Sequence, residues 1–133
     1  MIPKSTTKLT SGDCCFIPSG DGKHVPFVFV SSVPKKRSYF FGALVRQALT
    51  SADVDDIQPE AILGPHAMLH IDCFAKNETP ILGNIASRLA AGELDRVKRE
   101  SLDMSVGAKN AVWGNRTIIK YADEVANTVG GNS

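Results

Sequence analysis

Three cysteines and three histidines are the side chains of this sequence best suited to act as nucleophiles, bases or metal ligands. A catalytic Cys–His pair needs a thiol beside an imidazole that can take its proton. No motif of the kind that surrounds a catalytic cysteine flanks Cys14, Cys15 or Cys73. We therefore expect the cysteines to be small hydrophobic residues in strands, and we predict no catalytic residue.

His66 and His70 are four residues apart, the spacing at which two histidines of one helix bind zinc in metalloproteases. The segment His66–Phe74 alternates as a strand does, and in a strand that spacing separates the two side chains by roughly 13 Å. Asp72 and Cys73 would point to opposite faces of the same strand and could not share a small ion. We predict no metal and no cofactor, and histidines with ordinary hydrogen bonds.

Carboxylates gather in one part of the chain, the polar, proline-containing segment Ser51–Glu60. We expect this segment to be an exposed connection between strands. Carboxylates in a loop are typical of a solvated surface, but they can also complement a basic site on a partner protein. The residues that we predict to bind a partner are Asp53, Asp55, Asp56 and Glu60.

The charge balance does not favour nucleic acid. The chain has 15 basic and 14 acidic residues, a formal net charge of +1, whereas phosphate binding normally requires a marked basic excess. No apolar run approaches the roughly 20 residues needed to cross a bilayer, so no membrane partner is expected. The odd number of cysteines and an N-terminus without an apolar signal core indicate a cytoplasmic protein.

The first half of the chain is rich in β-branched and aromatic residues separated by turn residues. The glycine-containing loop Ser19–Lys23 between two such runs predicts a β-hairpin. We predict an α+β fold: a small curved antiparallel sheet or SH3-like partly open barrel, with a C-terminal helix packed on it. The expected strands are Cys14–Pro18, His24–Val33, Tyr39–Val45, Ala61–Leu63, His66–Phe74 and Ile81–Ile85.

The second half of the chain has a helical pattern. In Arg116–Val129 apolar residues recur at spacings of three and four, with Asn115 as the N-cap and Gly130 as the C-cap. Trp113 is expected to anchor this helix to the sheet. Gly92 interrupts the region before it, so Ser87–Lys109 forms either one helix or two. We expect a single domain over residues 1–133, with a β-sheet portion at about 12–86 and a helical portion at about 87–130.

Short motifs follow one another along the chain: Gly12-Asp13, Phe16-Ile17-Pro18, Asp21-Gly22-Lys23, Leu69–Phe74, Pro80–Ile85 and Val112–Asn115. In this order they resemble the immunity protein 26 family of bacterial polymorphic toxin systems. The resemblance implies an SH3-like sheet with helical additions. It also implies a protein that binds a cognate toxin and neutralises it by blocking the toxin's active site. It supplies no catalytic residues and no toxin contacts.

Two other functions remain open from the sequence. One is a small-barrel protein of a toxin–antitoxin module that binds or cleaves RNA. It would use Lys35, Lys36, Arg37 and Arg46 with an aromatic platform near Tyr39 and Phe40. The other is a cysteine-dependent enzyme centred on Cys14 or Cys15.

Overall fold

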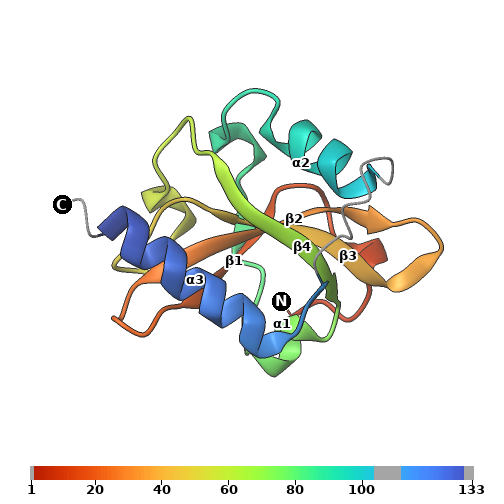
Figure 1. The fold of residues 1–133 in the computed structure, drawn as a ribbon, viewed down its shortest axis with the longest axis horizontal. Helices are drawn as coiled ribbons and strands as arrows, with labels where there is room; N and C mark the ends of the chain where they lie inside the picture. The colour runs from red at the N-terminus through yellow and green to blue at the C-terminus, as the bar shows by residue number, and fades with distance from the viewer. Residues whose placement is uncertain (1, 104–111, 131–133) are drawn as a thin grey trace.

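The protein, described here by a computed structural model over residues 2–103 and 112–130, is built on one six-stranded sheet (Figure 1). The order across the sheet is β5-β1-β2-β3-β4-β6, and the sheet is not closed into a barrel. Neighbouring strands are antiparallel except β4 and β6, which are parallel. The strands are β1 (Asp13–Pro18), β2 (His24–Val33), β3 (Lys36–Val45), β4 (Leu63–His70), β5 (Gly83–Asn84) and β6 (Val112–Trp113). The α+β class is confirmed.

Two tight turns connect β1, β2 and β3, which are neighbours in the sheet. Gly22, with φ of 83°, lies in the turn between β1 and β2, where a left-handed backbone favours glycine. Between β2 and β3 the turn is Pro34-Lys35, because Val33 pairs with Lys36. Lys35 has φ of 65°, an uncommon conformation for a residue with a side chain. The predicted hairpin of β1 and β2 is confirmed.

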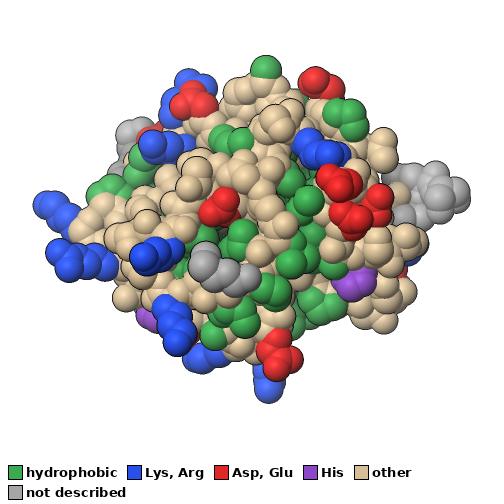
Figure 2. Space-filling model, turned by 180° about the vertical axis from the view of Figure 1, so that it is seen from behind, with side chains coloured by type: hydrophobic (Ala, Val, Ile, Leu, Met, Phe, Trp, Pro, Cys, Tyr) green, Lys and Arg blue, Asp and Glu red, His purple; other side chains and the backbone are tan. Residues whose placement is uncertain are grey.

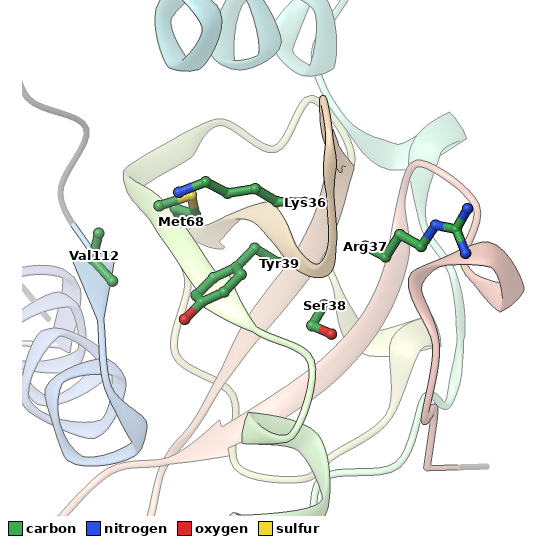
Figure 3. A pocket seen from close by; sticks show the side chains of 6 residues that line it. All are labelled: Lys36, Arg37, Ser38, Tyr39, Met68 and Val112. Carbon is green, nitrogen blue, oxygen red and sulfur yellow. The ribbon is translucent and has the colours of Figure 1, made fainter.

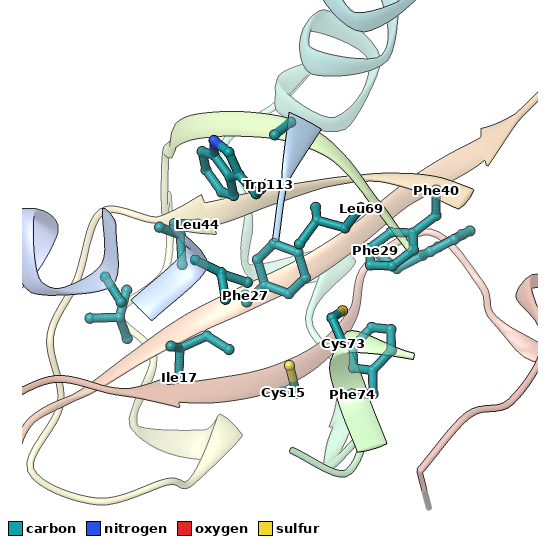
Figure 4. Packing of buried hydrophobic residues seen from close by; sticks show 14 of the residues in the cluster. Cys15, Ile17, Phe27, Phe29, Phe40, Leu44, Leu69, Cys73, Phe74 and Trp113 are labelled. Carbon is teal, nitrogen blue, oxygen red and sulfur yellow. The ribbon is translucent and has the colours of Figure 1, made fainter. Parts of the chain in front are cut away.

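One face of the sheet is covered by α3 (Asn115–Gly130) and the short helix α1 (Cys73–Lys76). Phe40 lies at the centre of this packing, stacked on Phe74 at 5.3 Å and edge-on to Phe27 at 6.1 Å between ring centroids (Figure 4). We call this the first core cluster. Its buried residues are Cys15, Ile17, Val25, Phe27, Phe29, Phe40, Leu44, Ala67, Leu69, Ile71, Cys73, Phe74, Trp113, Ile118, Ala122, Val125 and Ala126.

The opposite face is covered by α2 (Glu93–Leu102) and by the single-turn 3-10 helices η2 (Val54–Asp56) and η3 (Ala86–Arg88), with a further 3-10 helix, η1 (Thr6–Lys8), near the N-terminus. This second core cluster consists of Cys14, Phe16, Val28, Val30, Phe41, Ala43, Val45, Ile57, Ala61, Leu63, Ile85, Leu89 and Val97. Because both faces are covered, the inner strands are nearly continuous apolar runs rather than alternating ones.

The C-terminal helix forms where predicted, but it includes both Asn115 and Gly130. The carbonyl of Gly114, not of the expected N-cap Asn115, accepts its first hydrogen bond, from Ile118 N–H at 3.3 Å. Its apolar stripe is buried at Ile118, Ala122 and Val125. Trp113, the anchor expected from the sequence, is 5% exposed and stacks on Tyr121 of α3 with 4.8 Å between ring centroids. Because β6 pairs with β4, this stack ties the helix to the sheet.

Three sequence predictions need correction. The strands expected at Ala61–Leu63 and at His66–Phe74 are one strand, β4, which runs from Leu63 to His70, and Cys73 and Phe74 belong to α1. Of the strand expected at Ile81–Ile85, only Gly83–Asn84 pairs with the sheet. The region from Ser87 is divided: Gly92, with φ of 81°, separates η3 from α2. Its last residues, 104–109, lie outside the described part. None of the described helices is long and apolar enough to cross a membrane.

Candidate functional site

The four carboxylates predicted to bind a partner all lie exposed in the connection between β3 and β4. Asp53 is the N-cap of η2, and its Oδ1 accepts a hydrogen bond from the backbone N–H of Asp55 at 2.9 Å. Asp56 accepts a hydrogen bond from the Ser51 hydroxyl at 2.8 Å. Two of the acidic side chains therefore help to fix the backbone that carries them.

Arg88 of η3 holds the same segment to the body of the protein. Its guanidinium donates to the carbonyl oxygens of Asp55 at 3.1 Å and Ile57 at 3.0 Å, and it lies 3.3 Å from the Asp55 carboxylate. Ile57 is 1% exposed, whereas the Asp55 side chain is 81% exposed. The segment thus has a buried anchor and an exposed charge only two residues apart.

A second clamp comes from the end of β3. The side-chain amide of Gln47 donates to the carbonyl of Gln58 at 3.0 Å and accepts from its N–H at 2.9 Å. Glu60 follows with φ of 59°, a left-handed conformation that costs a residue with a side chain roughly 1–2 kcal/mol. We call residues 53–60 the acidic segment. It presents four carboxylates from a backbone held at Asp55, Ile57 and Gln58.

The three cysteines are placed in the core. Cys14 faces the second core cluster, and Cys15 and Cys73 face the first. Burial raises the pKa of Cys14 and of Cys73 to about 12, and it also raises the pKa of Cys15 well above its ordinary value. A nucleophilic cysteine needs an accessible thiolate, so this placement does not support the cysteine-dependent enzyme.

Two of the histidines have carboxylate partners. His66 Nε2 lies 3.1 Å from Glu100 of α2, and His70 Nδ1 lies 2.8 Å from Asp72. Over the described ranges, no group of three or more His, Cys, Asp or Glu side chains is arranged to hold a metal ion. The histidine pair considered for zinc lies on a strand, as the sequence indicated.

Arg46 is not brought together with the other three basic residues proposed for RNA. Lys35, Lys36 and Arg37 are exposed at the tip of the β2–β3 hairpin. Arg46 follows the opposite end of β3, about 30 Å away along an extended strand, and its side chain packs over Gly64. Phe40, one of the two aromatic residues of the supposed platform, is fully buried.

The hairpin instead borders a shallow hollow of about 510 Å³ (Figure 3). Its walls include two residues to which the sequence assigned no functional role, Met68 of β4 and Val112 of β6. These residues are far apart in the chain and adjacent in the sheet. A parallel pairing of this kind has no local sequence signal that could have indicated it.

The acidic segment and the basic hairpin lie at opposite ends of the molecule (Figure 1). Seen from behind, Lys and Arg side chains project at one end, and acidic side chains gather toward the other (Figure 2). A nearly neutral chain therefore has two surfaces of opposite charge.

Comparison with protein families, with curated proteins and with solved structures found no match to this chain.

Proposed function

We propose that this chain is an immunity-type protein that binds a cognate bacterial toxin in the cytoplasm and neutralises it by blocking its active site. The observation that carries this proposal is the acidic segment, whose backbone is clamped by Gln47 and Arg88 while its carboxylates remain exposed. The resemblance of the sequence motifs to an immunity family supports the same function.

Electrostatics gives the physical reason. Toxins that act on nucleic acids or nucleotides keep positive charge in their clefts, because their substrates are anionic. An inhibitor that presents carboxylates on a fixed segment complements that charge and loses little conformational entropy on binding. Ile57, buried in the second core cluster next to Asp56, anchors the segment to the body of the protein.

Co-expression with the toxin encoded beside its gene tests the function directly. The protein should restore growth and co-purify with the toxin. The proposal fails if the toxin kills equally well in the presence of the folded protein.

A neutralised variant tests the surface separately. Asp53, Asp55 and Asp56 are changed to Asn, and Glu60 to Gln. The fold should survive, because asparagine is a good N-cap, the change at position 56 retains a carbonyl acceptor for Ser51, and the Asp55–Arg88 ion pair is exposed. Toxin binding should weaken through a slower association rate and lose most of its dependence on salt.

The matched control removes four exposed carboxylates elsewhere. Its substitutions are Asp21→Asn, Glu78→Gln, Asp95→Asn and Glu124→Gln. Both variants have the same net charge, so a difference in association rate reports position rather than total charge. If the two variants associate with the toxin at equal rates and with equal salt dependence, the acidic segment is an ordinary solvated loop and does not contact the toxin.

A further inference from the structure

The hollow beside the β2–β3 hairpin has an apolar floor made by three neighbouring strands. Tyr39 comes from β3, Met68 from β4 and Val112 from β6. Val112 is 59% exposed, an unusual exposure for a strand valine, and Tyr39 and Met68 are partly exposed beside it. The Lys36 side chain extends over Met68 along the rim (Figure 3). The floor is apolar and the rim is cationic.

The positive charge of the rim is not neutralised within the described part of the chain. Lys35, Lys36 and Arg37 are consecutive and exposed, and none makes an ion pair with a described carboxylate. The residues that line the hollow include no acidic side chain. Arg37 points away from the hollow, so the positive surface continues around the hairpin (Figure 3).

Two hydrogen bonds from outside the hairpin fix its backbone at Arg37 and Ser38. The carbonyl of Arg37 accepts a hydrogen bond from the buried Thr6 hydroxyl at 2.9 Å, and the carbonyl of Ser38 accepts from Ile71 N–H at 2.7 Å. Lys35 occupies a left-handed turn position that favours glycine. The hairpin therefore presents its cations from a fixed backbone.

We propose that this hollow and the adjoining cations form a second binding surface, which takes an acidic segment of a protein partner. An apolar side chain of the partner packs on Met68 and Val112, while neighbouring carboxylates pair with Lys36 and Lys35. The flexible thioether of Met68 suits apolar side chains of different shapes. This surface is at the other end of the molecule from the acidic segment, so it does not depend on the proposed toxin contact.

The aromatic contacts favour protein over single-stranded RNA. A base needs an open aromatic face on which to stack. The Lys36 ammonium already lies over the Tyr39 ring, 5.7 Å from its centroid, and His70 packs perpendicular to that ring at 5.1 Å. Phe40, the next aromatic residue, offers no exposed face.

Methyl NMR on the whole chain tests the proposal. The probe is an unlabelled peptide of repeated Glu-Glu-Leu, and the reporters are the methyl groups of Met68 and Val112. Saturable shifts of these methyl signals that weaken with salt are expected. The variant Lys35→Gln/Lys36→Gln should bind roughly tenfold more weakly, as expected for the loss of two exposed charge pairs. The control Lys98→Gln/Lys120→Gln changes the same net charge on α2 and α3 and should bind as the unmodified protein does.

Three outcomes would overturn the proposal. The first is a peptide titration that leaves the Met68 and Val112 signals in place. The second is equal weakening in the hairpin variant and the control, which would mean nonspecific attraction. The third is a poly-uridine oligonucleotide that shifts the same methyl signals at lower concentration than the peptide, which would make the hollow an RNA surface.

Discussion

The carboxylate of Glu93 accepts a hydrogen bond from the backbone N–H of Leu63 at 2.7 Å. Arg96, one turn further along α2, donates to the carbonyl of the same residue at 3.1 Å and pairs with Glu93 at 2.9 Å. Leu63 begins β4, and β6 pairs with β4 only at Met68 and Leu69. Two helix side chains therefore occupy the backbone groups that an edge strand would otherwise offer to another chain.

Changing Glu93 to Ala should destabilise the fold by about 1–3 kcal/mol, because it leaves the partly buried N–H of Leu63 without its acceptor. Glu93→Gln keeps an acceptor oxygen and should cost less. Urea unfolding measures the free energies, and hydrogen exchange of the Leu63 amide should accelerate most in the alanine variant. Unchanged exchange at Leu63 would mean that the side chain does not protect this strand end.

The same carboxylate should make the protein sensitive to acid. The hydrogen bond from Arg96 is the main cause that holds the pKa of Glu93 below its ordinary value, with a further contribution from the Leu63 N–H. A depressed pKa in the folded state adds stability above the unfolded pKa, which is about 4.3 for glutamate, and that stability disappears as pH falls through the folded value. Between neutral pH and pH of about 3, Glu93→Gln should therefore lose less unfolding free energy than the unmodified protein. If the unfolding free energies of the two proteins fall in parallel as pH decreases, the Glu93 carboxylate does not contribute to the acid sensitivity.

Gly42, in the middle of β3, allows an aromatic ring to lie directly on the backbone. A Cβ atom at this position would clash with the Phe27 ring and would lie 2.9 Å from a ring carbon of Phe40. Both rings are fully buried in the first core cluster and cannot move aside freely. Gly42→Ala should cost about 1–3 kcal/mol or more through overpacking. Gly22→Ala is the comparison for strain without a clash, because open space surrounds Gly22. A Gly42 variant as stable as the original protein in urea would show that Phe27 can repack.

The buried thiols should be chemically silent in the native state. Their pKa values are raised by burial, so at pH of about 8 the native protein should react with a disulfide reagent only as fast as it unfolds. A raised folded pKa also means that stability is present below the unfolded value of about 8.5 and falls as pH rises above it. Cys14→Ala/Cys73→Ala should reduce this alkaline loss, at a packing cost on the order of 1–3 kcal/mol per residue. Rapid labelling of a folded sample would reopen the cysteine-dependent enzyme.

Local patterns in the sequence predicted the elements whose neighbours are close in the chain. The β1–β2 hairpin and α3 follow from turn glycines and from apolar residues at helical spacing. The segment Cys73–Phe74 was misassigned because two adjacent buried residues fit a strand with both faces covered as well as one helical turn. The acidic segment was correctly placed in an exposed connection, but its clamps by Gln47 and Arg88 were not foreseeable from composition.

For the RNA hypothesis, residue spacing alone was enough to predict that Arg46 lies far from the other basic residues. An expected strand over Tyr39–Val45 already places Arg46 far from Lys36, because an extended chain rises about 3.3 Å per residue. The hollow, in contrast, could not be predicted from the sequence. Its floor depends on the parallel contact of β4 with β6, and no short-range pattern specifies that contact.

Lys35 and Glu60 should each show a trade-off between stability and binding. Both occupy left-handed backbone positions, at 65° and 59°, and each lies in one of the two charged surfaces. Glycine relieves a strain of roughly 1–2 kcal/mol but loses about 0.5–1 kcal/mol to the entropy of the unfolded chain. Lys35→Gly and Glu60→Gly should therefore raise the unfolding free energy by up to about 1.5 kcal/mol. Lys35→Gly should weaken the peptide contact and leave the toxin contact unchanged, and Glu60→Gly should do the reverse. Urea unfolding and the two binding titrations measure these changes. If a glycine variant gains stability and binds its partner as tightly as the unmodified protein does, the charged side chain at that position does not contribute to binding.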